Sequence, residues 1–187
     1  MARVLVLYGT LEGQTAKISE YIAEVAKDLG YNAEAVNIAE LPSGFPLEEY
    51  EAVIVGASVH MKRHEDYVRD FVKNNRESLE RIPSAFFSVS LTAVEKTEEA
   101  RSQIGEVIER FIEETGWHPD RLGIFAGALA YTRYGFVKRY FMKRIVKEKR
   151  SGDIDTSRDY EYTNWEDVRR FSEDFLEVLS GDQERSP

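Results

Sequence analysis

Residues 4–15 read Val4-Leu5-Val6-Leu7-Tyr8-Gly9-Thr10-Leu11-Glu12-Gly13-Gln14-Thr15. The apolar first part, which ends at a glycine, is typical of a buried parallel strand. The loop that follows offers two threonine hydroxyls, a glycine that lets the backbone approach closely, and the free N–H groups of a helix start, and this combination suits a phosphate monoester. No Lys follows the loop, so it is not the ATPase pattern Gly-x-x-x-x-Gly-Lys-Ser/Thr. The alternative interpretation is an ordinary N-cap threonine with a turn glycine.

Length and composition indicate one soluble globular domain. The chain has 187 residues, 42% of them hydrophobic and 32% charged, and it contains no cysteine. No apolar run approaches the roughly 18–20 residues that span a bilayer, and a strand is expected by residue 4, so neither a membrane span nor a signal peptide is expected. The net charge of −9 argues against general nucleic-acid binding. We therefore expect a cytoplasmic protein with a single domain over residues 1–180 and a flexible tail over 181–187.

Short apolar runs alternate with helical periodicity along the chain. Helix ends are expected at Gly30 and Gly116, and Asn164 is the expected N-cap of the last helix. Five strands that alternate with helices predict an α/β fold with a doubly wound parallel sheet in the order 2-1-3-4-5, whose ligands bind at the carboxyl ends of strands 1 and 3. The expected strands are residues 4–8, 33–38 (the weakest, and so nearest an edge), 52–57, 85–89 and 122–129.

An insertion of unusual length follows the fifth strand. About thirty residues, 131–163, separate that strand from the last helix, where loops of about 2–6 residues are usual. Between Arg133 and Arg150 the insertion carries eight basic residues and one acid, so this segment has a charge of +7 and the rest of the chain −16. Such segregation indicates an anionic partner. For the basic aromatic stretch 134–147, three interpretations remain open: a membrane-surface helix, a site for the propionates of a porphyrin, or a helix that packs on the sheet.

Two resemblances are specific enough to name. The loop at residues 10–15 resembles the phosphate loop of the flavodoxin family, Thr/Ser-x-Thr-Gly-x-Thr, with Glu12 in the place of a third hydroxyl. With an acidic residue at this position, the loop is similar to that of the FMN- and quinone-dependent protoporphyrinogen IX dehydrogenase branch of flavodoxin-like proteins. Three further blocks resemble that branch: Pro83–Val89; Ala126–Leu129 with Tyr131, Arg133 and Tyr134; and Asp155-Thr156 followed by Tyr162–Trp165.

The resemblance implies an FMN site formed by three loops. These are the phosphate loop (Thr10, Leu11, Glu12, Gly13, Gln14, Thr15), the end of the third strand (Ser58, Val59, His60, Met61) and the end of the fourth (Ser88, Val89, Ser90, Leu91, Thr92, Ala93).

The resemblance also implies an activity and partners. The expected reaction is the six-electron oxidation of protoporphyrinogen IX, with electrons passed through FMN to menaquinone or ubiquinone at the inner face of the membrane. Tyr131 and Arg133 are the candidate substrate contacts, the catalytic base is not identified, and a homo-oligomer is left open. A soluble electron-carrier flavodoxin and a general FMN-dependent quinone reductase are the alternative functions. The candidate contacts to an anionic membrane surface are Lys138, Arg139, Lys143 and Arg144.

His60 and His64 are four residues apart, a spacing at which two histidines on one helix face can bind a metal ion. No Glu or third His completes such a set, so no metal site is expected, and His60 is interpreted as a residue of the flavin loop.

Overall fold

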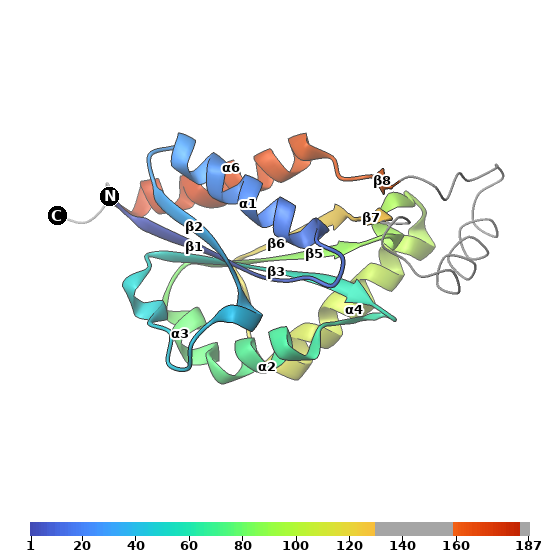
Figure 1. Ribbon diagram of the computed structural model, residues 1–187, viewed down its shortest axis with the longest axis horizontal. Coiled ribbons are helices and arrows are strands. Elements are labelled where there is room, and N and C mark those ends of the chain that lie inside the picture. The colour runs from blue at the N-terminus through green and yellow to red at the C-terminus, as the bar shows by residue number, and fades with distance from the viewer. Residues whose placement is uncertain (130–158, 184–187) are drawn as a thin grey trace.

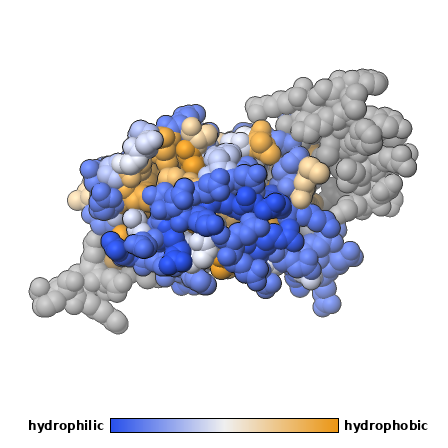
Figure 2. Space-filling view, turned by 90° about the horizontal axis from the view of Figure 1, so that it is seen from below, coloured by the Kyte–Doolittle hydropathy of each residue, from blue (hydrophilic) through white to orange (hydrophobic). Residues whose placement is uncertain are grey.

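The computed structural model describes residues 1–129 and 159–183. In this part of the chain a parallel sheet lies between two layers of helices, with α1 and α6 on one face and α2, α3 and α4 on the other (Figure 1). The outer surface of the α2–α4 layer is mostly hydrophilic (Figure 2). The strands are β1 (Arg3–Gly9), β2 (Asn32–Asn37), β3 (Ala52–His60), β4 (Arg63–His64), β5 (Ser84–Ser90), β6 (Arg121–Ala126), β7 (Ala128–Leu129) and β8 (Tyr160–Glu161). The helices are α1 (Gln14–Asp28), α2 (Asp66–Asn74), α3 (Arg76–Arg81), α4 (Glu98–Thr115) and α6 (Trp165–Gln183), with short 3₁₀ turns at Ile38–Glu40, Leu47–Glu49 and Thr92–Val94.

The sheet order confirms the sequence prediction. The parallel strands lie in the order β2-β1-β3-β5-β6, in which β5 and β6 are the predicted fourth and fifth strands. The weak run at 33–38 forms β2, at an edge of this sheet as expected.

Both faces of the sheet are buried, because side chains alternate between the two helical layers. Val4 and Val6 belong to the cluster under α1 and α6, whereas Leu5 and Leu7 belong to the cluster under α2–α4. Phe87 and Phe86 divide in the same way on β5. Burial on both faces explains why these strands are continuous apolar runs rather than alternating ones.

The predicted helix ends are also present. Gly30 and Gly116 have φ values of 91° and 69°, the left-handed conformation that favours glycine at a helix C-terminus. Asn164 accepts the backbone N–H of Glu166 with its side-chain oxygen, at 3.1 Å, and so caps α6. Helix α6 continues to Gln183, so it includes the first three residues of the expected tail, 181–183.

Two strand ends differ from the prediction. β3 does not end at residue 57 but continues to His60 and turns back as a hairpin into β4. The turn residues Met61 and Lys62 both have positive φ, 48° and 62°, and neither is the Asn or Gly that would announce such a turn in a sequence.

The run predicted as one strand over 122–129 breaks at Gly127. β6 ends at Ala126, and β7 pairs antiparallel with β8, so the last residues of the predicted insertion form part of the folded domain. Within the described residues no helix has the length and apolar character needed to cross a bilayer.

Candidate functional site

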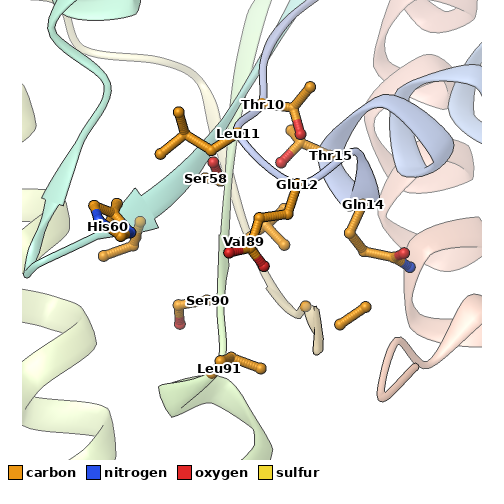
Figure 3. Close-up of a pocket in the computed structure, with 13 residues that line it drawn as sticks. Thr10, Leu11, Glu12, Gln14, Thr15, Ser58, His60, Val89, Ser90 and Leu91 are labelled. Carbon is orange, nitrogen blue, oxygen red and sulfur yellow. The ribbon is translucent and has the colours of Figure 1, made fainter. Parts of the chain in front are cut away.

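Parallel pairing brings the ends of the strands together at one edge of the sheet. Gly9 of β1 pairs with Ala57 of β3, and Ser90 of β5 pairs with Ala126 of β6. A cleft opens at this edge, between the loop after β1, the hairpin arm of β3, the end of β5 and the turn after β6 (Figure 3). It is lined by Thr10, Leu11, Glu12, Gln14, Thr15, Ser58, Val59, His60, Val89, Ser90, Leu91, Gly127 and Ala128.

The loop before α1 is held in a fixed shape. Gly13 has a φ of 93° and is the N-cap of α1, and its N–H donates to Thr10 Oγ1 at 2.8 Å. The N–H of Thr10 donates in turn to the hydroxyl of Tyr67, at 3.0 Å. Because Thr10 Oγ1 acts as the acceptor for Gly13, its own proton remains to be donated into the cleft. No threonine side chain caps α1, so the alternative interpretation of an ordinary N-cap threonine is wrong.

Thr15 provides the test of whether this loop fits a phosphate group. Its side chain is fully buried, and its Oγ1 has no hydrogen-bond partner among the described residues. A buried hydroxyl without a partner is costly unless a ligand satisfies it. Thr10 and Thr15 come together at the start of α1, whereas Glu12 extends away from them into the cleft (Figure 3). Two hydroxyls and a helix N-terminus therefore fit a phosphate monoester.

Gln14 links the phosphate loop to the end of the insertion. Its side-chain amide donates to Thr163 Oγ1 at 2.8 Å, and the Thr163 hydroxyl donates to the carbonyl of Ala126 at 2.7 Å. Thr163 belongs to the quoted block Tyr162–Trp165 but is not among the expected FMN residues, because it lies 149 residues from Gln14 and no local pattern joins the two. Gly127 and Ala128 of the cleft lining were also not selected as site residues, although they lie in one of the blocks quoted above.

The hairpin forms the second wall of the cleft. Ser58, Val59 and His60 lie on the extended arm of β3 and line the cleft. Met61 lies at the tip of the hairpin with 86% of its surface exposed. Ser58 donates its hydroxyl proton toward the buried carboxyl of Glu65, which follows the hairpin.

The expected site residues at the end of β5 and just after it divide between two places. Val89, Ser90 and Leu91 line the cleft, whereas Met61, Ser88 and Thr92 line a neighbouring hollow beside α4 that shares Val59, Ser90 and Leu91 with it. Ala93 is placed in neither hollow and packs against the core under α2–α4.

Ser88 is held by His64 rather than directed into the cleft. His64 Nε2 lies 2.9 Å from Ser88 Oγ, and the imidazole packs edge-on against Phe86 and Phe111. Burial, together with a smaller contribution from the nearby Arg69, lowers the pKa of His64 to about 3. His64 is therefore a neutral side chain of the core at ordinary pH.

The two histidines do not share a helix face. His60 is exposed on β3, His64 is buried on β4, and the described residues contain no cluster of three metal-ligating side chains. The remaining candidates, Tyr131, Arg133, Lys138, Arg139, Lys143 and Arg144, lie outside the described residues.

Comparisons with known proteins agree with this geometry. Residues 5–157 match the family model described as flavodoxin domain. The chain is 35% identical over 176 residues to the Escherichia coli K12 protein named protoporphyrinogen IX dehydrogenase (quinone), a match that covers 94% of this chain and 96% of the relative. A Leishmania major protein with the same name is 34% identical over 174 residues, which cover 92% of this chain and 74% of the relative.

Solved structures support the fold. Oxidised flavodoxin 1 from Bacillus cereus superimposes with a TM-score of 0.54 at 14% identity, covering 94% of this chain and 98% of that one. The match to the flavodoxin domain confirms the expected cofactor, FMN, and the two named relatives confirm the oxidoreductase class. The chain therefore belongs to the flavodoxin-domain family of quinone-dependent protoporphyrinogen IX dehydrogenases.

Proposed function

We propose that this protein oxidises protoporphyrinogen IX to protoporphyrin IX and passes the electrons through FMN to a quinone. The observation that carries the proposal is the similarity to the E. coli relative of that name, which extends over 94% of this chain and 96% of the relative. A match of that extent includes most of the insertion at 131–163.

In this proposal the residues of the cleft bind FMN and do not themselves carry out the redox chemistry. Bound FMN accepts and returns the electrons. Thr10, Thr15 and the N-terminus of α1 would hold its phosphate, while the β3 arm and the end of β5 would flank its ring. No Lys or Arg is among the residues that line the cleft in the described part of the chain, so hydroxyls and backbone amides would hold the phosphate.

The proposed function also includes contact with a membrane. A long-chain quinone resides in the bilayer, and the +7 segment between Arg133 and Arg150 suits the anionic inner face of a cell membrane. In this proposal Lys138, Arg139, Lys143 and Arg144 contact lipid headgroups, Tyr131 and Arg133 contact the substrate, and menaquinone or ubiquinone takes up the electrons.

A two-step anaerobic assay tests the function. The purified FMN-bound protein is mixed with protoporphyrinogen IX, and the flavin absorbance should bleach as porphyrin fluorescence appears. A menaquinone analogue should then restore the oxidised spectrum. Bleaching by a reduced nicotinamide nucleotide but not by the porphyrinogen would indicate a general quinone reductase, and rapid exchange with redox proteins alone would indicate an electron carrier.

A further inference from the structure

Glu65 is a buried carboxyl directly behind the wall of the cleft. It lies between β4 and α2, where its carbonyl accepts the N–H groups of Val68 and Arg69, and only 8% of its surface is exposed. Its Oε1 accepts the hydroxyl proton of Ser58, which lines the cleft. Its Oε2 is buried and has no hydrogen-bond partner among the described residues.

Charges on the neighbouring elements do not neutralise this carboxyl. Arg69 of α2 pairs with Asp66 at 2.8 Å and with Glu114 at 3.1 Å, and Arg63 of β4 pairs with Glu114 at 2.9 Å. The other titratable groups on the elements around Glu65 include His60 on β3, His64 on β4, Tyr67, Asp70 and Lys73 on α2, and Tyr8 and Glu12 on β1 and its loop.

The neighbouring histidine and tyrosine do not supply a positive charge either. His64 is neutral at ordinary pH, and burial raises the pKa of Tyr67. Burial also raises the pKa of the Glu65 carboxyl, although hydrogen bonds from the Ser58 hydroxyl and from the backbone N–H groups of Ser58 and Glu65 partly oppose this.

The protonation state of Glu65 decides whether the Ser58 hydroxyl presents a proton or only lone pairs to the cleft. A hydroxyl has a single proton and two lone pairs. When Glu65 is ionised, Ser58 donates to it and presents only lone pairs to the cleft. When Glu65 is protonated, Glu65 can donate to Ser58 Oγ, and the Ser58 proton is free to turn into the cleft. The pair can therefore accept a proton from the cleft or supply one to it.

We infer that Ser58 and Glu65 form the proton relay of the cofactor cleft, with Glu65 as the group that stores the proton. The inference rests on the proposed function. In each two-electron step a C–H bond of the substrate breaks, FMN when bound would take up the hydride, and the substrate also loses a proton. The substrate N–H bond breaks, Ser58 Oγ takes that proton while passing its own to Glu65, and a Glu65 O–H bond forms. In the quinone step Glu65 returns its proton to Ser58, and Ser58 passes its own proton to a quinone oxygen. With the two electrons and the proton of a hydride, this second proton completes the reduction of the quinone to a quinol.

The first experiment observes the proton on Glu65 without any substrate. Infrared spectra of the FMN-bound protein, recorded over a range of pH, should show a protonated carboxyl band that disappears at a pH above the ordinary pKa of glutamate. Glu65→Gln should remove this band. Asp70→Asn is the matched control, because Asp70 is an exposed carboxylate of α2 that takes no part in the ion pairs around Arg69 described above, and the band should remain.

The second experiment measures coupling to the cofactor. The two-electron midpoint potential of bound FMN should depend more steeply on pH in the unmutated protein and in Asp70→Asn than in Glu65→Gln. Ser58→Ala leaves the carboxyl in place but removes the link, so its band should persist while the additional pH dependence of the potential is lost.

Either of two results would overturn the relay. One is a titrating band that survives in Glu65→Gln, and the other is an unchanged pH dependence of the potential in Glu65→Gln or Ser58→Ala. FMN binding and far-UV circular dichroism establish that each variant is folded. If Glu65→Gln does not fold, the pH dependence of the potential in Ser58→Ala decides whether the relay exists. Neither measurement uses the porphyrinogen, so the relay and the proposed function fail independently.

Discussion

A substitution at Thr15 should affect the stability of the fold and the affinity for FMN differently. Its hydroxyl is buried without a partner in the described structure, and an unsatisfied buried group costs about 1–3 kcal/mol. Thr15→Val keeps the shape of the side chain and removes the hydroxyl. The free energy of unfolding of the FMN-free protein, from urea denaturation, should therefore stay constant or rise by about 1 kcal/mol.

The same change should weaken FMN binding roughly ten- to a hundred-fold, because a hydrogen bond to a charged group contributes about 1.5–3 kcal/mol. Fluorescence titration measures the affinity. Riboflavin, which lacks the phosphate, is the control and should bind both proteins equally. A parallel loss of FMN and riboflavin affinity would mean that Thr15 does not contact the phosphate.

His64 makes stability depend on pH. Its folded pKa of about 3 lies below its unfolded pKa of about 6.5, so its contribution is complete above pH 6.5 and is lost as the pH falls toward 3. At about 1.4 kcal/mol per pH unit, roughly 2 kcal/mol should be lost between pH 6.5 and pH 5. His64→Gln cannot gain this proton, so its urea midpoint should fall less over the same range. Glu65 titrates in both proteins and cancels in the difference. Equal losses would show that His64 is not the group responsible.

At the scale of elements, the pairing of β7 with β8 determines where the insertion can be removed. Leu129 lies opposite Tyr160 in this antiparallel pair, so a two-residue Asn-Gly turn can join the two strands in place of residues 130–159. The shortened protein keeps Thr163 and its hydrogen bonds to Ala126 and Gln14. It should bind FMN within a few-fold of the full chain.

Quinone-coupled oxidation of the porphyrinogen should be lost in the same shortened protein, because the proposed membrane and substrate contacts are removed. The assay is steady-state porphyrin formation, with far-UV circular dichroism to verify the fold. Normal turnover would show that residues 130–159 take no part in the reaction.

At the scale of the whole molecule, the charge distribution predicts selective membrane binding. A +7 segment on a chain that otherwise carries −16 should bind anionic vesicles and not zwitterionic ones. Each basic residue near the surface contributes about 1 kcal/mol, and the binding should weaken at 1 M salt, where the Debye length is about 3 Å.

Vesicle sedimentation measures this association. Reversal of Lys138, Arg139, Lys143 and Arg144 to Glu should abolish it and leave the flavin spectrum unchanged. Co-sedimentation of the reversed variant at the level of the unmutated protein would contradict the membrane proposal.

The local pattern of the sequence was sufficient for the framework of this protein. Continuous apolar runs mark strands that are buried on both faces, and the alternation of strands with helices leaves few sheet orders. Gly30, Gly116 and Asn164 mark helix ends because the conformations and hydrogen bonds needed there favour those residues. The position of Thr10 and Thr15 beside the start of α1 was also predictable, because residues 10–15 are contiguous and directly follow a strand.

Tertiary structure alone decided how the walls of the cleft are built and which neighbours hold their side chains. β3 extends three residues further than expected, so the expected loop is a hairpin. Successive side chains of a strand point to opposite faces, so the length of the strand determines which way each one points. The sequence could therefore not show that Ser58 faces Glu65 or that Ser88 is held by His64. Thr163 reaches Gln14 only because α6 packs on α1 and β8 pairs with β7. Such contacts depend on packing between distant segments, which no local pattern contains.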